Sequence, residues 1–394
     1  MSSVMVSLKR HKKKFVLLIV LILSFHSMLS SLFNDFKRQS TSPRPPRATQ
    51  SSSKKLNTSE VSLNAAKPKK SPIDMVNDYY PFVDFRFVYP DISPKFNETR
   101  NIFMIILVNS AAKGVKYRKR REAIRETWGS TGNCEQLNAL RNGKLKDLRW
   151  LLLFVLGKAG PGTRDDELNE AEARRYNDML IGNITDNYIN NIIKFYMGHL
   201  WANKFDVKYT MKTDDDVYVR IPRVLEYLVN AKLPRPFYGG FSRAPSPVSR
   251  RVGVKSAISY KYYEEALFPT FHLGAFFILS TDLLNKLFNY VYIRKPFHTD
   301  DAYVGVAMRD FGVKPTNITS FHLIHSMRRY MGSFKDCEIF NWNAFGHSLD
   351  PRSIKALHIR VQSLVCKNTT LDIEDHRCRK SATKTTTSTR GRFR

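Results

Sequence analysis

Cysteine is scarce in this sequence, and acidic residues are few beside the basic ones. Four cysteines in 394 residues are too few for a small disulfide-stabilised scaffold. The 35 acidic residues face 64 basic ones, which gives a formal net charge of +29. Residues 1–72 alone hold fourteen basic and two acidic residues, and residues 379–394 hold six basic and no acidic ones. Because the basic excess lies largely at the two ends, the central part carries little signal for nucleic-acid binding.

Long uncharged hydrophobic runs are also rare. One run, residues 15–33, follows a basic cluster and is long enough to cross a membrane, because a helix of this length rises roughly 28 Å. The preceding positive charge predicts a cytoplasmic tail, residues 1–14, and a transmembrane signal-anchor at 15–33. A cleaved signal peptide that ends near residues 27–31 is the alternative. In both cases the rest of the chain enters the secretory lumen.

Two further segments have few of the apolar residues that a core requires. Residues 34–75 are rich in Ser, Thr, Pro, Lys and Arg, which predicts a disordered stem, and residues 379–394 predict a disordered tail. The whole chain is 42% hydrophobic and 12% aromatic, so residues 76–378 have the composition of a large folded domain.

Two kinds of residue agree with a luminal location. Asn-X-Ser/Thr triplets are acceptors for N-glycosylation, and disulfides persist in the secretory pathway. The four cysteines allow three pairings, among which the sequence does not choose. The triplets begin at Asn57, Asn97, Asn183, Asn317 and Asn368, and the cysteines are Cys134, Cys337, Cys366 and Cys378.

Continuous apolar runs alternate with helical patterns in the central part. Such runs are typical of buried parallel strands, and their alternation with helices predicts an α/β fold with a mostly parallel central sheet covered on both faces. The predicted strands are 102–108, 151–156 and 207–211, and the predicted helices are 118–128, 167–178, 188–205 and 221–230.

Three consecutive aspartates, Asp214, Asp215 and Asp216, directly follow the last of these strands. Ligands bind at the carboxyl ends of strands in open α/β sheets, and Asp214 and Asp216 would face the same side of an extended segment. Their hard oxygen atoms suit Mg²⁺ or Mn²⁺. An acidic turn or a helix cap is the alternative interpretation. A calcium-binding loop does not fit, because Val219 stands at its glycine position.

A second acidic pair, Asp300 and Asp301, precedes a helical pattern that runs to residue 311. Taken alone, the pair is typical of a helix cap. If a metal–phosphate site exists nearby, one of these carboxylates can instead accept the proton of an incoming hydroxyl group.

Seven segments, in order over about 270 residues, resemble one enzyme family, the inverting β1,3-galactosyltransferases and β1,3-N-acetylglucosaminyltransferases of glycosyltransferase family 31. They are Arg-Arg-Glu-Ala-Ile-Arg-Glu-Thr-Trp-Gly at 120–129, Leu-Leu-Phe-Val-Leu-Gly at 152–157, the run from Glu172 to Lys194, Lys-Thr-Asp-Asp-Asp-Val-Tyr-Val at 212–219, Phe-Pro-Thr-Phe at 268–271 with Gly274, Asp-Asp-Ala-Tyr-Val-Gly at 300–305, and Cys337 with His-Ser-Leu-Asp-Pro at 347–351 and Cys366.

The resemblance implies a GT-A-type, Rossmann-like fold, a UDP-sugar donor and Mn²⁺ or Mg²⁺. Asp216 and Asp214 would bind the metal together with His347, and Asp301 would be the general base in a single inverting displacement. Asp216 and Asp301 would then lie on opposite sides of the donor sugar, and residues 216, 301 and 347 would surround one pocket. It also implies a type II Golgi membrane protein with a luminal catalytic domain.

Supporting roles follow from the same resemblance. Arg121 and Arg125 would share a helix face that points at the nucleotide, with a solvated basic face as the alternative. Asp178 and Lys194 would lie near the donor, with a surface ion pair as the alternative, and Asp215 would join them. Other residues with expected places are Trp128 in the core and His322 and His325 as rival metal ligands.

The chain departs from the family pattern at Ala275 and Phe276, where glycine is usual, so the backbone approach to the sugar is expected to differ. Residues 244–254 look like a mobile loop that closes over the donor. The favoured function is a β1,3-hexosyltransferase, with UDP-galactose ahead of UDP-N-acetylglucosamine as donor and a glycoprotein or glycolipid glycan as acceptor. A catalytically silent, membrane-tethered carbohydrate-binding protein is the alternative, and nucleic acid is not an expected partner.

Overall fold

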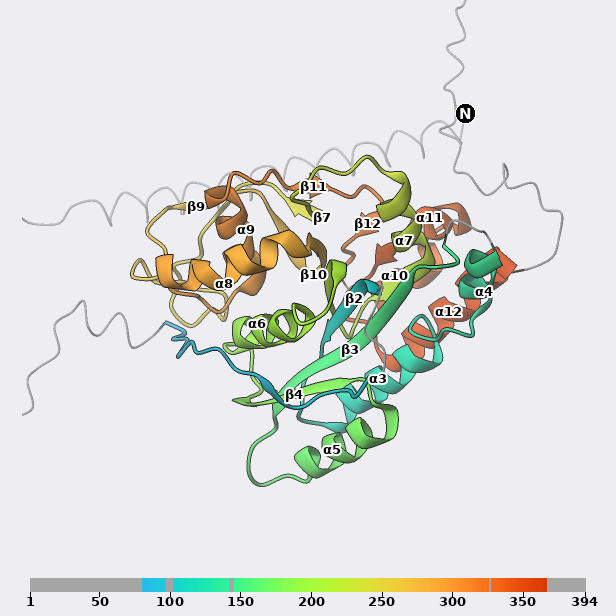
Figure 1. Ribbon diagram of the computed structural model, residues 1–394, viewed down its shortest axis with the longest axis horizontal. Coiled ribbons are helices and arrows are strands. Elements are labelled where there is room, and N and C mark those ends of the chain that lie inside the picture. The colour runs from blue at the N-terminus through green and yellow to red at the C-terminus, as the bar shows by residue number, and fades with distance from the viewer. Residues whose placement is uncertain (1–79, 97–101, 142–144, 326, 367–394) are drawn as a thin grey trace, which may run out of the picture. The chain divides into compact units, whose positions relative to one another are not determined.

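The computed structural model describes residues 80–96, 102–141, 145–325 and 327–366, all within one unit of the chain, Lys69–Arg394 (Figure 1). In this part of the chain the main sheet has eight strands in the order β1-β4-β3-β2-β5-β10-β7-β11. Their bounds are β1 Pro90–Ile92, β2 Ile102–Asn109, β3 Arg149–Lys158, β4 Met179–Thr185, β5 Val207–Asp214, β7 Tyr238–Arg243, β10 Phe271–Ser280 and β11 Thr316–Asn317.

The centre of this sheet is parallel. Strands β4, β3, β2 and β5 run side by side in the same direction, while β1 and β10 pair antiparallel at either side of them. Beyond β10, β7 is antiparallel to it and β11 is parallel to β7. The predicted α/β fold with a mostly parallel central sheet is therefore confirmed.

Helices cover both faces of the sheet, as the buried strand patterns predict. The longer ones are α3 Val115–Glu126, α4 Cys134–Arg141, α5 Asp165–Tyr176, α6 Asn191–Ala202, α7 Ile221–Asn230, α8 Leu284–Ile293, α9 Asp300–Asp310 and α12 Pro351–Cys366. Shorter elements are β6 Tyr218–Val219, β8 Ser246–Pro247, β9 Leu267–Phe268, β12 Phe321–His322, β13 Ala344–Phe345, α10 Met327–Tyr330, α11 Asp336–Asn341 and the 3₁₀ helices η1 Thr281–Leu283 and η2 Met331–Ser333.

Strand β2 shows why the sheet needs a helix layer on each side. Its side chains alternate, so that Ile105 and Leu107 join one apolar cluster, while Met104, Ile106 and Val108 join another. The first cluster includes residues of α6, α8 and α9, and the second includes residues of α3, α7 and α12. A strand apolar at every position is stable only when both of its faces are covered.

Element boundaries differ from the sequence prediction at two places near the site. Strand β5 reaches Asp214 rather than residue 211, because Lys212 and Thr213 pair with β10 although they are polar. Helix α6 begins at Asn191 rather than at residue 188, because the Asn187 side chain accepts a hydrogen bond from the Asn190 backbone N–H and closes a turn first. Helix α7 spans residues 221–230 as predicted.

Several other expectations have outcomes in the described residues. Trp128 is buried, as expected, and Cys134 is disulfide-bonded to Cys366, which joins α4 to α12. Cys337 is disulfide-bonded as well. Asn183 and Asn317 are exposed.

The predicted tail, anchor and stem at 1–75 and the basic tail at 379–394 lie outside the described residues, as do Asn57, Asn97, Asn368 and Cys378. Within the described part, none of the helices combines the length and the apolar character that crossing a membrane requires.

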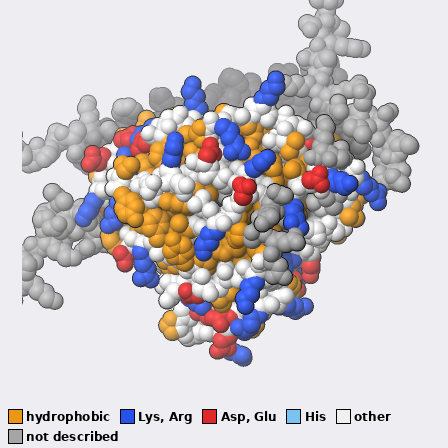
Figure 2. Space-filling view, in the orientation of Figure 1, with side chains coloured by type: hydrophobic (Ala, Val, Ile, Leu, Met, Phe, Trp, Pro, Cys, Tyr) orange, Lys and Arg blue, Asp and Glu red, His pale blue; other side chains and the backbone are white. Residues whose placement is uncertain are grey.

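Residues 244–254 are not simply a loop. They contain β8, which pairs with β9, and the Arg250 guanidinium donates hydrogen bonds to the carbonyl groups of Ile258, Tyr263 and Glu265. On the face in Figure 2, side chains of both charges are interspersed with a broad apolar area over α8, where Tyr292 and Ile293 are exposed.

Candidate active site

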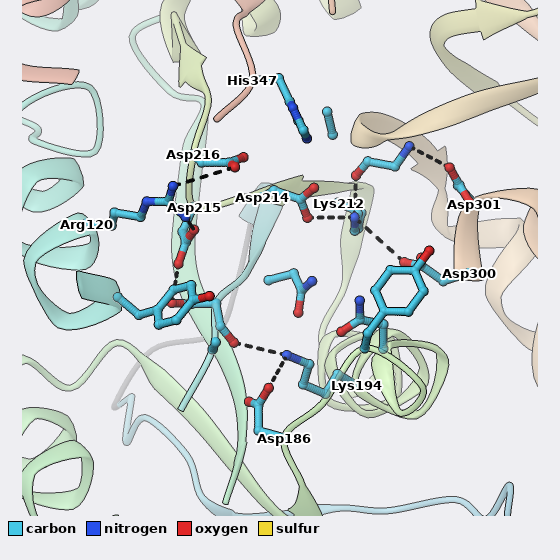
Figure 3. Close-up of a pocket in the computed structure, with 18 of the residues that line it drawn as sticks. Arg120, Asp186, Lys194, Lys212, Asp214, Asp215, Asp216, Asp300, Asp301 and His347 are labelled. Atoms are coloured by element: carbon cyan, nitrogen blue, oxygen red, sulfur yellow. Dashed lines mark hydrogen bonds and ion pairs between the residues drawn. The ribbon is translucent and has the colours of Figure 1, made fainter. Parts of the chain in front are cut away.

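A cavity of about 650 Å³ lies where β2 and β5 end at the carboxyl edge of the sheet (Figure 3). Many charged side chains line it: Lys113, Arg120, Asp186, Lys194, Lys212, Asp214, Asp215, Asp216, Lys255, Asp300, Asp301 and His347. The expectation that residues 216, 301 and 347 surround one pocket is therefore confirmed. Figure 3 shows Asp216 and Asp301 on opposite sides of this cavity.

The three consecutive aspartates are not extended, which corrects the sequence prediction. Asp214 is the last residue of β5, and a turn takes Asp215 and Asp216 away from the strand direction. The turn is fixed to β2, because the Asp215 backbone N–H donates to the Asn109 carbonyl at 3.2 Å. The three carboxylates consequently point in different directions and have different partners.

Asp215 faces the protein interior. Its carboxylate accepts hydrogen bonds from Arg120 Nη1 at 2.9 Å and from Ser110 Oγ at 2.6 Å, and 4% of the residue is exposed. Burial raises the pKa of Asp215 to about 6, against the opposing charge of Arg120. With both oxygens occupied, Asp215 holds β5 to α3 and the β2 loop.

Asp216 keeps one carboxylate oxygen without a hydrogen-bond partner among the described residues. This oxygen is the buried Oδ1, while Oδ2 lies 3.8 Å from Arg120 Nη2. Burial, and after it the charge of Asp214, raises the pKa of Asp216. A buried carboxylate oxygen without a partner costs free energy unless a ligand completes it.

The loop that carries His347 is attached to this turn. The Leu349 backbone N–H donates to the Asp216 carbonyl at 2.9 Å, and the charge of His347 acts on the Asp216 carboxylate. Figure 3 shows the His347 ring directed into the cavity beside Asp216. The two other histidines considered as metal ligands, His322 and His325, do not line the cavity. The His322 ring packs on Trp342, and the His325 ring packs edge-on against the His347 ring, with 5.3 Å between the ring centroids.

Lys212 links the two acidic groups across the cavity. Its Nζ donates to Asp214 Oδ1 at 2.8 Å and to the Gly274 carbonyl, and it lies 3.7 Å from Asp300 Oδ2. Burial lowers the pKa of Lys212, but the charges of Asp214 and Asp300 raise it more, so the pKa stays above its usual value. The ammonium is therefore a permanent positive charge between the carboxylates.

Asp301 stands in the first turn of α9. Its Oδ2 accepts a hydrogen bond from the Gly274 backbone N–H at 3.0 Å, and its Oδ1 accepts one from Ala302 N–H at 2.8 Å. Burial, and next the charge of Asp300, raises the pKa of Asp301 to about 6. A carboxylate with this pKa, held at the wall of a polar cavity, suits general base catalysis near neutral pH.

The backbone at Gly274 approaches this carboxylate closely. A Cβ atom at this position would lie 3.4 Å from Asp301 Oδ2 and 3.3 Å from Lys212 Nζ. Of the bulkier residues that follow, Ala275 lines the cavity, whereas Phe276 and Phe277 are buried in the two apolar clusters. Ala275 is therefore the departure from the family pattern that the cavity itself contains.

The expected nucleotide-binding arginines do not line the cavity, which corrects that assignment. Arg121 is fully buried and forms a bidentate ion pair with Glu172, at 2.6 and 2.9 Å. Arg125 bridges Glu172 and Asp178, each at 2.7 Å, which also places Asp178 away from the cavity. These four residues, the arginine network, join α3 to α5 and to the residue that precedes β4. Sequence spacing places Arg121 and Arg125 on one helix face but does not say what covers that face.

Lys194 does line the cavity, but its charge is already neutralised. Its Nζ donates to Asp186 Oδ1 and to the Ser110 carbonyl, both at 3.0 Å. Asp186 Oδ2 in turn accepts from the backbone N–H groups of Gly157 and Ala112. The pair therefore fastens the loops after β2 and β4 to the end of β3 and forms part of the cavity floor.

A metal ion would have to be held by the acidic side chains of this cavity. In the described part of the chain, no group of three or more His, Cys, Asp or Glu residues is placed to hold a metal ion by itself. The unpartnered Asp216 oxygen and the neighbouring Asp214 nevertheless suit a divalent cation such as Mg²⁺, which is commonly bound by one or two carboxylates together with substrate phosphates. The residues therefore fit a cation that arrives with a diphosphate.

Sequence reasoning misses three residues of this site. It selects Arg121 rather than its neighbour Arg120, it gives Lys212 no role beyond its place in a motif, and it does not place Tyr188 in the cavity wall. Burial and the charges of Asp301 and Asp300 raise the pKa of Tyr188 to about 12. The signal available for Lys212 is its position two residues before Asp214, on the same side of a strand.

This arrangement of carboxylates and ammonium groups stands at the carboxyl edge of an α/β sheet, where ligands and active sites of such folds are found. Residues 119–319 match the family model described as "Galactosyltransferase", which covers just over half of the chain, so the chain belongs to that family and is a glycosyltransferase.

Named relatives agree at the family level. The chain is 29% identical over 238 residues to "Beta-1,3-galactosyltransferase 1" of Mus musculus, and this alignment covers 58% of this chain and 67% of the relative. The chain is also 29% identical over 276 residues to "UDP-GalNAc:beta-1,3-N-acetylgalactosaminyltransferase 1" of Homo sapiens, and that alignment covers 66% of this chain and 78% of the relative. Both names specify a β1,3-glycosyltransferase, so activity of that type is supported at the level of the family.

Proposed function

We propose that the protein is an inverting β1,3-hexosyltransferase of the GT-A type. It transfers a sugar, galactose in the first place, from a UDP-sugar to the 3-hydroxyl group of an acceptor sugar on a glycoprotein or glycolipid. The observation that carries the proposal is the cavity in which the half-buried carboxylate of Asp301 faces Asp214 and Asp216. A binding protein without catalytic activity has no need of a carboxylate whose pKa is raised by burial and by a neighbouring Asp300 at this position.

In the proposed reaction Asp301 accepts the proton of the acceptor hydroxyl group. The oxygen forms a bond to the anomeric carbon while the bond from that carbon to the diphosphate oxygen breaks, and UDP leaves with the bonding electrons. Attack from the face opposite UDP converts an α-linked donor into a β-linked product. The Gly274 and Ala302 N–H groups hold the Asp301 carboxylate in place for this step.

The diphosphate side of the cavity is assigned to Asp214, Asp216 and His347. These residues would hold Mn²⁺ or Mg²⁺ with the diphosphate, and a bound cation would stabilise the charge that develops on UDP. Arg120 fixes the turn that carries Asp215 and Asp216, and the Lys212 ammonium keeps Asp214 in position.

The donor sugar is assigned from the names of the two relatives. The names of the two relatives specify galactosyl and N-acetylgalactosaminyl transfer, and these sugars share the axial 4-hydroxyl group that N-acetylglucosamine lacks. We therefore place UDP-galactose first, with UDP-N-acetylgalactosamine and UDP-N-acetylglucosamine as alternatives.

We further propose that the enzyme is a single-pass type II Golgi protein with a luminal catalytic domain. The support is in the sequence: the uncharged run 15–33 follows a basic segment, and Asn-X-Ser/Thr triplets occur beyond it.

The decisive test uses the detergent-solubilised full chain with a panel of UDP-sugars, Mn²⁺ and β-linked galactose, glucosamine and galactosamine acceptors. The proposal predicts one preferred donor and a β1,3 linkage by NMR. Failure to transfer from any UDP-sugar, with UDP still bound, would support the silent carbohydrate-binding protein.

A further inference from the structure

A second cavity lies directly behind the catalytic one. It has a volume of about 10 Å³, which is close to the space that one water molecule requires. Its lining comes from β2, β3, β5, α6 and α9 and consists of Leu107, Asn109, Val155, Asn191, Lys194, Phe195, His199, Lys212 and Asp300. Lys194, Lys212 and Asp300 line both cavities, so the small cavity shares its polar wall with the active site.

Three side chains of this lining have buried polar atoms with no hydrogen-bond partner among the described residues. These atoms are Asn109 Oδ1, His199 Nε2 and Asp300 Oδ2. Buried polar atoms without partners are rare in folded proteins, and three of them around one cavity point to a shared ligand.

The His199 ring presents an acceptor to this cavity. Its Nδ1 lies 2.7 Å from the Phe195 carbonyl, which can only accept a hydrogen bond, so Nδ1 carries the proton. Burial lowers the pKa of His199 to about 4, which keeps the ring neutral. Nε2 is therefore left as an acceptor, like the amide oxygen of Asn109 and the carboxylate oxygen of Asp300 in the same lining.

The chemistry of the wall selects the ligand. Each ammonium has three hydrogen atoms. Lys194 donates two of them to Ser110 and Asp186. Lys212 donates two to Asp214 and Gly274, and its Nζ lies 3.7 Å from Asp300 Oδ2, which is an ion pair but too long for a direct hydrogen bond. A cation would be repelled by these two charges. A water molecule can accept the remaining ammonium hydrogen and donate its own two hydrogens to the acceptors.

We propose that this cavity binds one permanent water molecule that links His199 Nε2 to Asp300 Oδ2, so that His199 is a positioning residue for the Asp300–Asp301 pair. The inference rests on the proposed role of Asp301 as base. Asp300 is the first residue of α9, and the hydrogen bond through the water fixes the start of that helix. The direction of the Asp301 carboxylate then depends on a histidine that never touches substrate.

The first test is a crystal structure of the full chain at a resolution that shows ordered water. We expect density within hydrogen-bond distance of both His199 Nε2 and Asp300 Oδ2. A dry cavity, or a His199 ring bonded elsewhere, would overturn the water site. This result does not depend on activity, so it separates failure of this inference from failure of the proposed function.

The second test compares His199→Phe and His199→Gln in the transferase assay. The phenylalanine variant removes the acceptor, and we expect kcat to fall about tenfold, the effect of one lost hydrogen bond, while KM for the UDP-sugar stays unchanged. Glutamine retains an acceptor, and kcat should recover in part. His358→Phe, which loses a hydrogen bond to Tyr218 outside both cavities, is the matched control and should retain wild-type kcat.

An unchanged kcat in His199→Phe would overturn the positioning role. If His199→Phe does not fold, His199→Gln and its crystal structure provide the test. A glutamine variant that has lost the water molecule but keeps wild-type kcat would overturn the positioning role of His199.

Discussion

Two groups of charged residues, both drawn from conspicuous sequence motifs, differ sharply in how well they are satisfied. In the arginine network, Arg121 and Arg125 are bonded to Glu172 and Asp178. In the aspartate cluster of residues 214, 216, 300 and 301, by contrast, Asp216 and Asp300 each keep a buried oxygen without a hydrogen-bond partner among the described residues.

The difference separates structure from function. A complete ion-pair network stabilises the geometry in which it sits and offers nothing to a ligand. An incomplete cluster of like charges costs folding free energy, and it persists where a substrate or cation completes it. The number of charged residues in a motif does not make this distinction, whereas the presence of unpaired buried atoms does.

The largest expected effect is that of removing the base. Asp301→Asn should reduce kcat by roughly two to four orders of magnitude, because the acceptor hydroxyl then has no group to take its proton. UDP affinity, measured by calorimetry, should be retained, since Asp301 lies across the cavity from Asp216, the residue assigned to the diphosphate side. Wild-type turnover would remove Asp301 as the base.

Removing the unsatisfied carboxylate on the other side should affect binding instead. Asp216→Ala should weaken Mn²⁺-dependent UDP binding at least about 100-fold. Removing a residue that only supports a metal ligand lowers metal affinity by up to about 100-fold, and removing a ligand itself should cost at least as much. The measurement is a calorimetric titration of UDP with Mn²⁺ and again with a chelator. Asp178→Asn, a carboxylate of the arginine network, is the control and should keep Mn²⁺-dependent binding. Equal UDP affinity in Asp216→Ala and wild type would refute the metal assignment.

Breaking the arginine network should reduce stability rather than activity. Glu172→Gln leaves Arg121 buried without its counter-charge and should lower the free energy of unfolding by about 3–5 kcal/mol, measured by urea denaturation. KM for the UDP-sugar should not change in the folded protein. A raised KM at unchanged stability would restore the nucleotide role of Arg121 and Arg125.

The smallest expected effect is a pH dependence. Asp301 must be ionised to act as base, and its pKa in the free protein is raised to about 6, so kcat/KM should increase as pH rises from 5 to 7 and level off above it. The raised pKa of Asp301 also stabilises the folded protein below the pKa of the unfolded state, and this stabilisation is lost as pH rises through 6. Activity and stability should therefore change in opposite directions with pH. Asp301→Asn should lack both trends, as followed by kcat/KM and thermal unfolding across pH. A wild-type kcat/KM that is flat from pH 5 to 7 would contradict the assignment.

Much of the fold follows from the sequence because buried parallel strands are apolar at every position. Residues 102–108 and 151–156 could be assigned to strands on that basis, and both lie within strands of the sheet. The polar end of β5 could not, since Lys212 and Thr213 are held in the strand by pairing with β10, a segment distant in sequence. Local pattern does not contain that information.

The sequence predicted which residues line the cavity better than it predicted the contacts of each charged side chain, again because those contacts come from segments distant in sequence. Asp216, Asp301 and His347 line one cavity as expected, because motifs name the residues that chemistry requires. Arg121 and Arg120 are neighbours of the same type in one motif, and only the packing of α3 shows that the first is enclosed and the second reaches the aspartates.

The sequence by itself determined the class of fold, the family and the identity of the acidic residues, because these depend on residue types and their order along the chain. The tertiary structure alone decided which charges are neutralised, which buried atoms are left without partners and which wall the two cavities share. These properties arise from contacts between segments far apart in the chain, and their free energies depend on burial and distance, which a linear pattern does not specify.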